Sequence, residues 1–98
     1  MSSGYLNQVN IHGDLVDIIG PISTTDGSEC AEGVVLYKYT SYNGISYDEY
    51  LKFSLYGGNV QKLLSAKVGD RILVHGKLRT NKTGGVSVLA ARIWIESI

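Results

Sequence analysis

The sequence predicts an all-β domain with five strands and one short helix between the third and the fourth strand. Three observations carry this prediction. Residues 47–58, YDEYLKFSLYGG, alternate apolar and polar side chains as a strand does when one of its faces is buried. Asn43-Gly44, shortly before this stretch, is a strong hairpin signal. The segment NVQKLLSAK, residues 59–67, has the i, i+3, i+4 apolar spacing of a short helix, at Val60, Leu63 and Leu64.

The other strands are expected at about residues 6–18, 30–39, 71–80 and 86–95. Between the first two, the stretch GPISTTDGSE is expected to form a turn, with Gly20, Pro21 and Asp26-Gly27 as breakers. Three strands, a helix and two strands in fewer than 100 residues fit the OB-fold, a five-stranded Greek-key barrel. An SH3-like barrel is the alternative, but it lacks a helix at this point.

The composition is that of one globular domain spanning residues 1–98, with residues 1–4 expected to be a flexible N-terminus. No apolar run approaches the roughly 20 residues of a membrane helix, and no secretory leader is recognisable. We therefore expect a cytoplasmic protein that makes no membrane contact. The single cysteine, Cys30, rules out an internal disulfide and is expected to be a small apolar residue.

The net charge is zero, but the charges are unevenly distributed. Residues 1–32 hold five acids and no Lys or Arg, whereas residues 33–98 hold nine cations against four acids, a formal balance of +5. Such asymmetry can create a basic face on a neutral protein. The alternative is chance clustering in a short chain.

Three stretches resemble the bacterial single-stranded DNA-binding protein (SSB) family, which includes the shorter primosomal relative PriB. They are YLNQVNIHGDL (5–15), EYLKFSLYG (49–57) and, most specific of the three, KVGDRILVHGKLRTNK (67–82). The resemblance implies an OB-fold that binds single-stranded DNA, with RNA as an alternative, by stacking bases on aromatic rings while cations follow the backbone. It also implies a homodimer or homotetramer paired through the first strand, acting in DNA replication, recombination or transfer with a protein partner from those processes.

The resemblance also implies the roles of particular residues. Tyr50 and Tyr56 fall on stacking positions with Lys52 between them, and Thr83 stands where the family has a further aromatic residue. The residues themselves add to this set, because Tyr37 and Tyr39 would share the outer face if Val34 and Leu36 pointed inward. The predicted interface is Tyr37, Tyr39, Tyr42, Tyr50, Lys52, Tyr56, Lys77, Arg79 and Lys82.

Other interpretations stay open at this stage. Tyrosines are good strand formers, so the aromatic residues could simply be cross-strand pairs. The chain ends soon after the fifth strand without the family's acidic tail, which favours PriB-like, phage or mobile-element relatives. The alternatives are thus a PriB-like accessory or an OB-fold protein-interaction module with weak or no nucleic-acid binding.

Trp94, expected to point outward, fits a subunit contact, a base contact or a cap at the barrel end. No catalytic constellation, cofactor motif or metal-ligand spacing is recognisable, so an enzyme is not expected.

Overall fold

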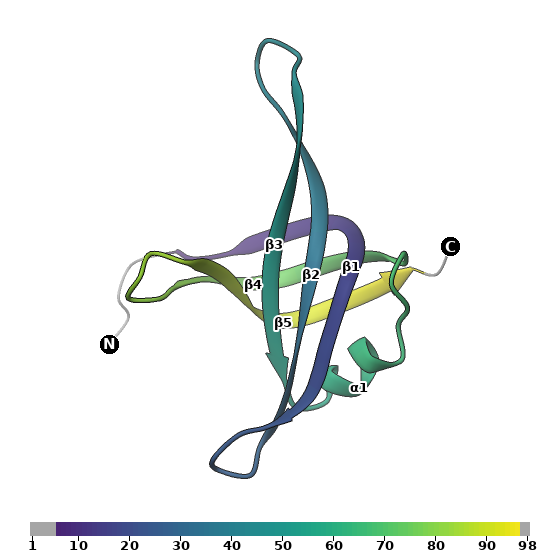
Figure 1. Ribbon diagram of the computed structural model, residues 1–98, viewed down its shortest axis with the longest axis vertical. Coiled ribbons are helices and arrows are strands. Elements are labelled where there is room, and N and C mark those ends of the chain that lie inside the picture. Colours follow the sequence, from purple (N-terminus) through teal and green to yellow (C-terminus); the bar gives the residue numbers. More distant parts are fainter. Residues whose placement is uncertain (1–5, 97–98) are drawn as a thin grey trace.

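The computed structural model describes residues 6–96 of the chain (Figure 1). It contains five strands and one helix in the predicted order. The prediction of a flexible N-terminus at residues 1–4 lies outside the described residues. The elements are β1 (Val9–Ser23), β2 (Glu29–Thr40), β3 (Ser46–Tyr56), α1 (Asn59–Leu64), β4 (Arg71–Thr80) and β5 (Val86–Glu96).

The five strands close into a barrel in the order β1-β2-β3-β5-β4. β1 pairs antiparallel with β4 through its first half and with β2 through its second half. A short parallel pair of β3 and β5 closes the ring, with Phe53 opposite Val88 and Ser54 opposite Leu89. Since α1 lies in the connection between β3 and β4, the predicted five-stranded barrel with one helix at this point is confirmed.

The core is built from alternate residues of the strands. On β3, Phe53 and Leu55 are fully buried and Leu51 is partly buried, as the alternation in the sequence predicts. Of the three helix residues with apolar spacing, Val60 and Leu63 are fully buried against the barrel as predicted, and Leu64 is only partly buried. The remaining core positions are Leu15, Ala31, Val35, Ile72, Val74, Val88, Ala90 and Ile93.

Gly33 on β2 makes room for the largest core ring. A Cβ atom at this position would lie 2.4 Å from Cζ of Phe53, its partner across the β2–β3 ladder. Since interiors are close-packed, no side chain larger than hydrogen fits at position 33 unless the ring moves. The register of this hairpin therefore places a glycine where the core needs one.

The prediction that Gly20 and Pro21 break the first strand is wrong. β1 continues through them to Ser23, and its ladder with β2 resumes at Ile22 opposite Cys30 after a shift in register. Proline has no N–H to donate to a ladder, but a bulge accommodates it because a residue in a bulge is left unpaired. Gly20 adopts a φ of 133° in the same irregularity, a conformation that favours glycine.

The turn predicted at Asp26-Gly27 connects β1 to β2. The carboxylate of Asp26 accepts hydrogen bonds from the Thr24 hydroxyl and, at 3.0 Å, from the backbone N–H of Ser28. The hydrogen bond from Thr24, followed by those from Ser28, lowers the pKa of Asp26 to about 2. The Asp26 side chain is therefore ionised in this turn at neutral pH.

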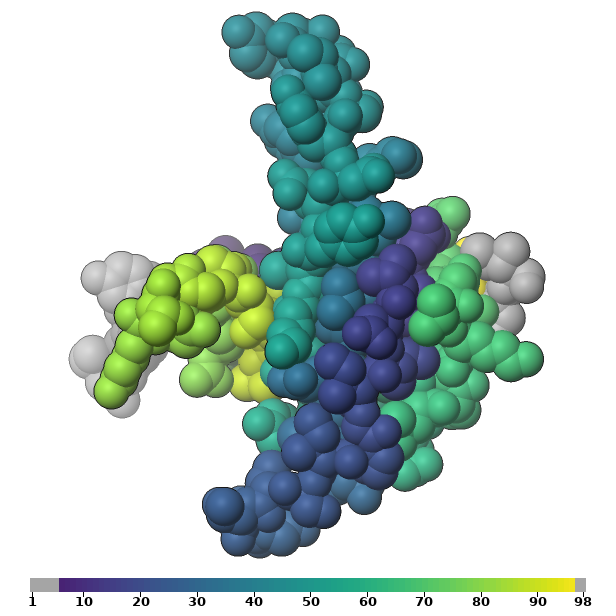
Figure 2. Space-filling view, in the orientation of Figure 1, coloured from purple at the N-terminus to yellow at the C-terminus, as the bar shows by residue number. Residues whose placement is uncertain are grey.

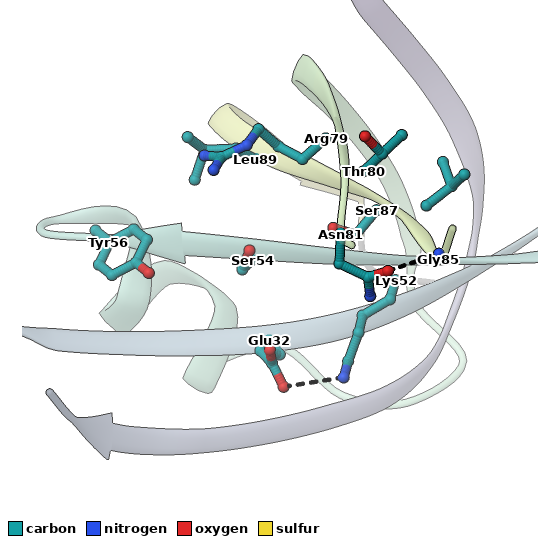
Figure 3. A pocket seen from close by; sticks show the side chains of 11 residues that line it. Glu32, Lys52, Ser54, Tyr56, Arg79, Thr80, Asn81, Gly85, Ser87 and Leu89 are labelled. Atoms are coloured by element: carbon teal, nitrogen blue, oxygen red, sulfur yellow. Dashed lines mark hydrogen bonds and ion pairs between the residues drawn. The ribbon is translucent and has the colours of Figure 1, made fainter. Parts of the chain in front are cut away.

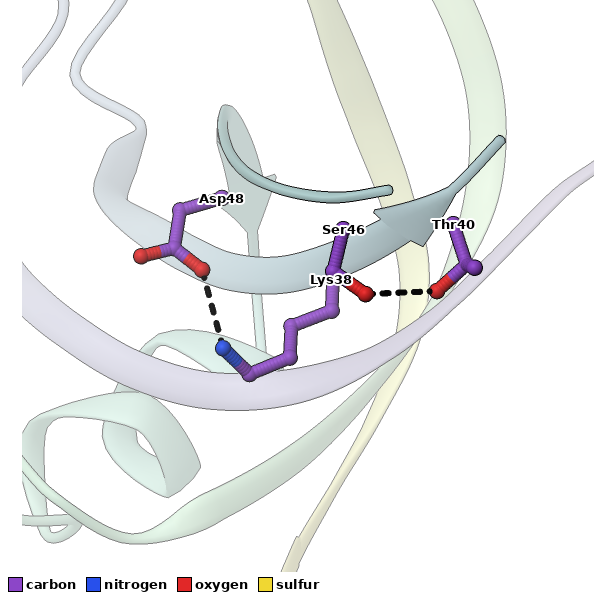
Figure 4. A network of polar contacts seen from close by, with 4 residues as sticks. All are labelled: Lys38, Thr40, Ser46 and Asp48. Atoms are coloured by element: carbon purple, nitrogen blue, oxygen red, sulfur yellow. Dashed lines mark hydrogen bonds and ion pairs between the residues drawn. The ribbon is translucent and has the colours of Figure 1, made fainter. Parts of the chain in front are cut away.

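The β2–β3 hairpin extends well beyond the barrel, and we call residues 37–49 the arm (Figures 1 and 2). Its tip is the predicted Asn43-Gly44 turn, in which the N–H of Ser41 donates to the carbonyl of Ile45 at 2.8 Å. On one face of the arm the rings of Tyr39 and Tyr47 stack, with centroids 6.3 Å apart. The other face is polar: Figure 4 shows the Lys38–Asp48 ion pair at 3.1 Å and the Thr40–Ser46 hydroxyl contact at 3.0 Å.

Candidate nucleic-acid interface

The outer face of β3 presents the residues that the alternation predicts. Tyr50 is 65% exposed and Tyr56 is 51% exposed, and the exposed Lys52 lies between them on the same face. Their neighbours in sequence, Phe53 and Leu55, point into the core and hold the strand in place. The two rings and the cation are therefore presented to solvent by a strand that is anchored from behind.

A groove of about 430 Å³ lies beside this face (Figure 3). One wall comes from β2 and β3, with Glu32, Lys52 and Tyr56, and the other from the β4–β5 hairpin. Ser54 and Leu89 are partners in the short parallel ladder, so they share a face and join the two walls. The residues contributed by the β4–β5 hairpin are Arg79, Thr80, Asn81, Gly85, Val86, Ser87 and Leu89.

Asn81 organises the loop at the end of this groove. Its Oδ1 atom accepts hydrogen bonds from the Thr83 N–H at 3.1 Å, the Thr83 hydroxyl at 2.8 Å and the Gly85 N–H at 2.7 Å. Both the N–H and the hydroxyl of Thr83 thus help to order the loop. Asn81 is not among the residues predicted for the interface, although the sequence Asn-Lys-Thr-Gly-Gly is typical of a turn stabilised by an Asn side chain.

The cations of the predicted interface differ in their surroundings. Lys52 Nζ lies 3.4 Å from Oε1 of Glu32, and Lys38 is paired with Asp48 on the arm. Lys77, Arg79 and Lys82 form no ion pair with a carboxylate of residues 6–96. The charge asymmetry of the sequence is therefore partly cancelled in the fold, because Glu32 and Asp14 from the acidic third pair with cations from the rest.

The expectation that Tyr37 and Tyr39 share the face of Tyr50 and Tyr56 is wrong. It required Val34 and Leu36 to point inward, whereas Val35 is the residue that is fully buried. Since side chains alternate along a strand, Tyr37 and Tyr39 lie on the face that is continuous with the core. The register agrees, because Tyr39 is opposite Tyr47, whereas Leu36 is opposite Tyr50. The aromatic residues therefore form two separate sets.

The remaining predicted residues lie at the edges of the groove or away from it. Lys77 pairs with Leu89 across the β4–β5 ladder, so it shares the groove-side face with Arg79. Lys82 is exposed in the loop after β4. Tyr42, at the tip of the arm, is fully exposed. The fold thus brings together Lys52, Tyr56 and Arg79, places Tyr50 and Lys77 beside them, and leaves Tyr42 and Lys82 on protruding hairpins.

A second hollow of about 500 Å³ lies on the β1, β4 and β5 strands and contains Trp94, His12 and Leu73. Trp94 is 47% exposed, as expected of an outward residue. The two hollows share no lining residue.

Within residues 6–96 no cluster of three or more His, Cys, Asp or Glu side chains could hold a metal ion. The helix α1, the one helix of residues 6–96, is not long and apolar enough to cross a bilayer.

No protein-family model and no curated protein sequence matches this chain. Solved structures match it in fold. PriB from Ralstonia solanacearum superposes with a TM-score of 0.79 at 13% identity, over 93% of this chain and 98% of that one. The second single-stranded DNA-binding protein (SSBb) of Mycobacterium smegmatis gives 0.75 at 18% identity, over 93% and 89%. The SSB domain of a Synechococcus protein gives 0.75 at 19% identity, over 94% and 98%. At these identities the likeness establishes the fold, and the OB-fold prediction is confirmed.

Proposed function

We propose that this protein binds single-stranded DNA with little sequence preference, along the outer face of β3 and in the groove beside it. The observation that carries the proposal is the exposed row of Tyr50, Lys52 and Tyr56, which runs into a groove that also contains Arg79. Every base has a π-face, so a tyrosine ring holds a base without reading it, at about 1–3 kcal/mol per base. Cations beside the rings attract the phosphates. The proposed activity is binding and not catalysis.

The spacing of the rings favours a strand over a free nucleotide as the ligand. Tyr50 and Tyr56 are six residues apart on an extended strand, which corresponds to about 20 Å. A ligand that contacts both rings must therefore span several nucleotides. The structures that share the fold include proteins named for single-stranded DNA binding, which supports the proposal. In the cell, the protein would protect or present single strands during replication, recombination or transfer.

Salt dependence tests the phosphate contacts. If Lys77, Arg79 and Lys82 each neutralise one phosphate, a plot of log K against log salt for poly-dT should have a slope of about −2, since each phosphate on a single strand contributes about −0.7. Replacing Arg79 by alanine should make the slope shallower by about 0.7. Arg92→Ala is the matched control, because Arg92 is exposed on β5 but does not line the groove. An affinity independent of salt, or equal effects of the two variants, would contradict these contacts.

A second candidate function is that of a PriB-like accessory that binds DNA weakly and bridges proteins. Two observations favour it. The ion pairs of Lys38 and Lys52 reduce the positive charge available to phosphates. The arm also exposes several apolar and aromatic side chains, which are typical of a contact with a partner. They are Tyr39, Tyr42, Ile45 and Tyr47. A folded protein with a very low affinity for poly-dT at low salt would favour this function.

We also propose that the protein forms a homodimer or homotetramer through the first half of β1. Among the described strands, Val9–Gly13 pairs with β4 alone, and pairing with β2 begins at Asp14. The other edge of this segment presents unpaired backbone groups, which strands commonly satisfy by pairing with another chain. Light scattering at tens of micromolar should give a mass of two or four chains. The mass of a single chain would contradict this proposal.

A further inference from the structure

Glu32 is an acidic residue in the middle of the surface to which we assign phosphate binding. It lies on β2 opposite Ser54 and diagonal to Lys52, whose ladder partner is Val34. Its side chain is 29% exposed, and that of Lys52 is 51% exposed. Figure 3 shows the carboxylate and the ammonium group pointing toward each other in the groove that also contains Tyr56 and Arg79. Neither the stacking of bases nor the attraction of phosphates requires a carboxylate here.

We propose that Glu32 acts as an internal phosphate substitute that limits the affinity of the groove for single strands and sets its salt dependence. This inference rests on the proposed function. In the free protein the Glu32 carboxylate is paired with the Lys52 ammonium group, and a phosphate that binds to Lys52 must displace the carboxylate. Once displaced, the same negative charge lies close to the phosphate and repels it. Glu32 therefore opposes binding twice.

The geometry of the pair suits such an exchange. The distance of 3.4 Å between Nζ and Oε1 is longer than the 2.7–2.9 Å typical of a charge-assisted hydrogen bond. Both groups remain in contact with solvent, so the pair contributes little to stability. A phosphate can thus take the place of the carboxylate without disturbing the core. Displacing Glu32 therefore lowers the affinity for the strand and leaves the stability of the fold unchanged.

The test compares Glu32→Gln with the unchanged protein, using fluorescently labelled dT oligonucleotides at several salt concentrations. Glu32→Gln should bind about fivefold more tightly at low salt, because removing one unit-charge repulsion across about 4 Å of water changes an equilibrium constant by about that factor. Its log K against log salt slope should steepen by about 0.7, because the phosphate on Lys52 no longer displaces a carboxylate, which in the unchanged protein takes up a cation from solution in exchange. Adding Lys52→Ala to Glu32→Gln should abolish the additional slope. The thermal midpoint should stay close to that of the unchanged protein.

Asp14→Asn is the matched control. It also removes one carboxylate from an exposed ion pair, with Arg71 at 3.0 Å, and changes the net charge by the same amount. Neither Asp14 nor Arg71 lines the groove, so this variant should bind like the unchanged protein. Equal gains in the two variants would assign the effect to net charge and overturn the role of Glu32.

The remaining outcomes separate the two proposals. If the unchanged protein binds dT and Glu32→Gln binds with the same affinity and slope, this inference is wrong and the proposed function stands. If the unchanged protein does not bind but Glu32→Gln does, the groove binds single strands and Glu32 suppresses the binding more strongly than expected. If neither binds while both are folded, both proposals fail.

Discussion

Replacing Phe53 by alanine is expected to lower the free energy of unfolding by about 3–5 kcal/mol, as truncation of a buried aromatic ring does. Phe53 is the largest fully buried side chain of the barrel. It lies in the ladder between Gly33 on β2 and Val88 on β5, at the point where β3 and β5 close the ring. The loss combines the burial of the ring with the cavity left behind, which the rigid strands around it can fill only in part.

Chemical denaturation of Phe53→Ala and Tyr50→Ala, compared with the unchanged protein, measures this effect. Tyr50 is a matched aromatic residue three positions away, but its ring is 65% exposed, so its truncation should change stability far less. DNA binding by Phe53→Ala should fall only as far as the protein unfolds. Equal losses of stability in the two variants would contradict the assignment of inner and outer faces on β3.

Replacing Tyr56 or Tyr50 by alanine is expected to weaken single-strand binding by about 1–3 kcal/mol, the range found when a stacking ring is removed. Tyr56 lines the groove beside Lys52, and Tyr50 lies on the same face of β3. Phenylalanine at either position should keep most of the affinity, because the π-face holds the base and the hydroxyl does not. Binding to labelled poly-dT at low salt measures both effects.

Two further aromatic variants serve as controls for this prediction. Trp94→Ala should leave the affinity unchanged, because Trp94 lies in the other hollow, which shares no residue with the groove. Tyr39→Ala tests the separate aromatic face of the arm, where Tyr39 stacks on Tyr47. If Tyr39→Ala loses affinity and Tyr56→Ala does not, the arm is the stacking surface and the groove is not.

The sequence predicts β3 well because apolar and polar residues alternate strictly in it. The same reasoning fails for β2, because Val34, Val35 and Leu36 are apolar in succession and do not show which of them points inward. Packing determines which face of β2 is buried. Gly33 and Val35 face the core because only a glycine fits opposite the Phe53 ring. This requirement can be recognised only when the register of the hairpin is known. A shift of one residue exchanges the faces of the whole strand, which moves Tyr37 and Tyr39 away from the groove.

The other differences also depend on pairing between distant segments. Gly20-Pro21 is typical of a turn, yet a bulge in the β1–β2 ladder absorbs it, and no local pattern distinguishes the two outcomes. The Glu32–Lys52 pair joins residues 20 positions apart, so the sequence places a cation in the interface and gives no sign of the acid beside it. The order of strands and the helix could be predicted because local periodicity and turn residues determine them.

The central claim, that the tyrosine and lysine face of β3 binds single strands, is tested most directly by titrating labelled poly-dT with the protein at low salt, with duplex DNA of the same length as control. The proposal predicts saturable binding to poly-dT and much weaker binding to the duplex, whose stacked bases cannot reach Tyr50 and Tyr56. Absence of binding to poly-dT by the folded protein, or equal affinity for the duplex, would contradict it.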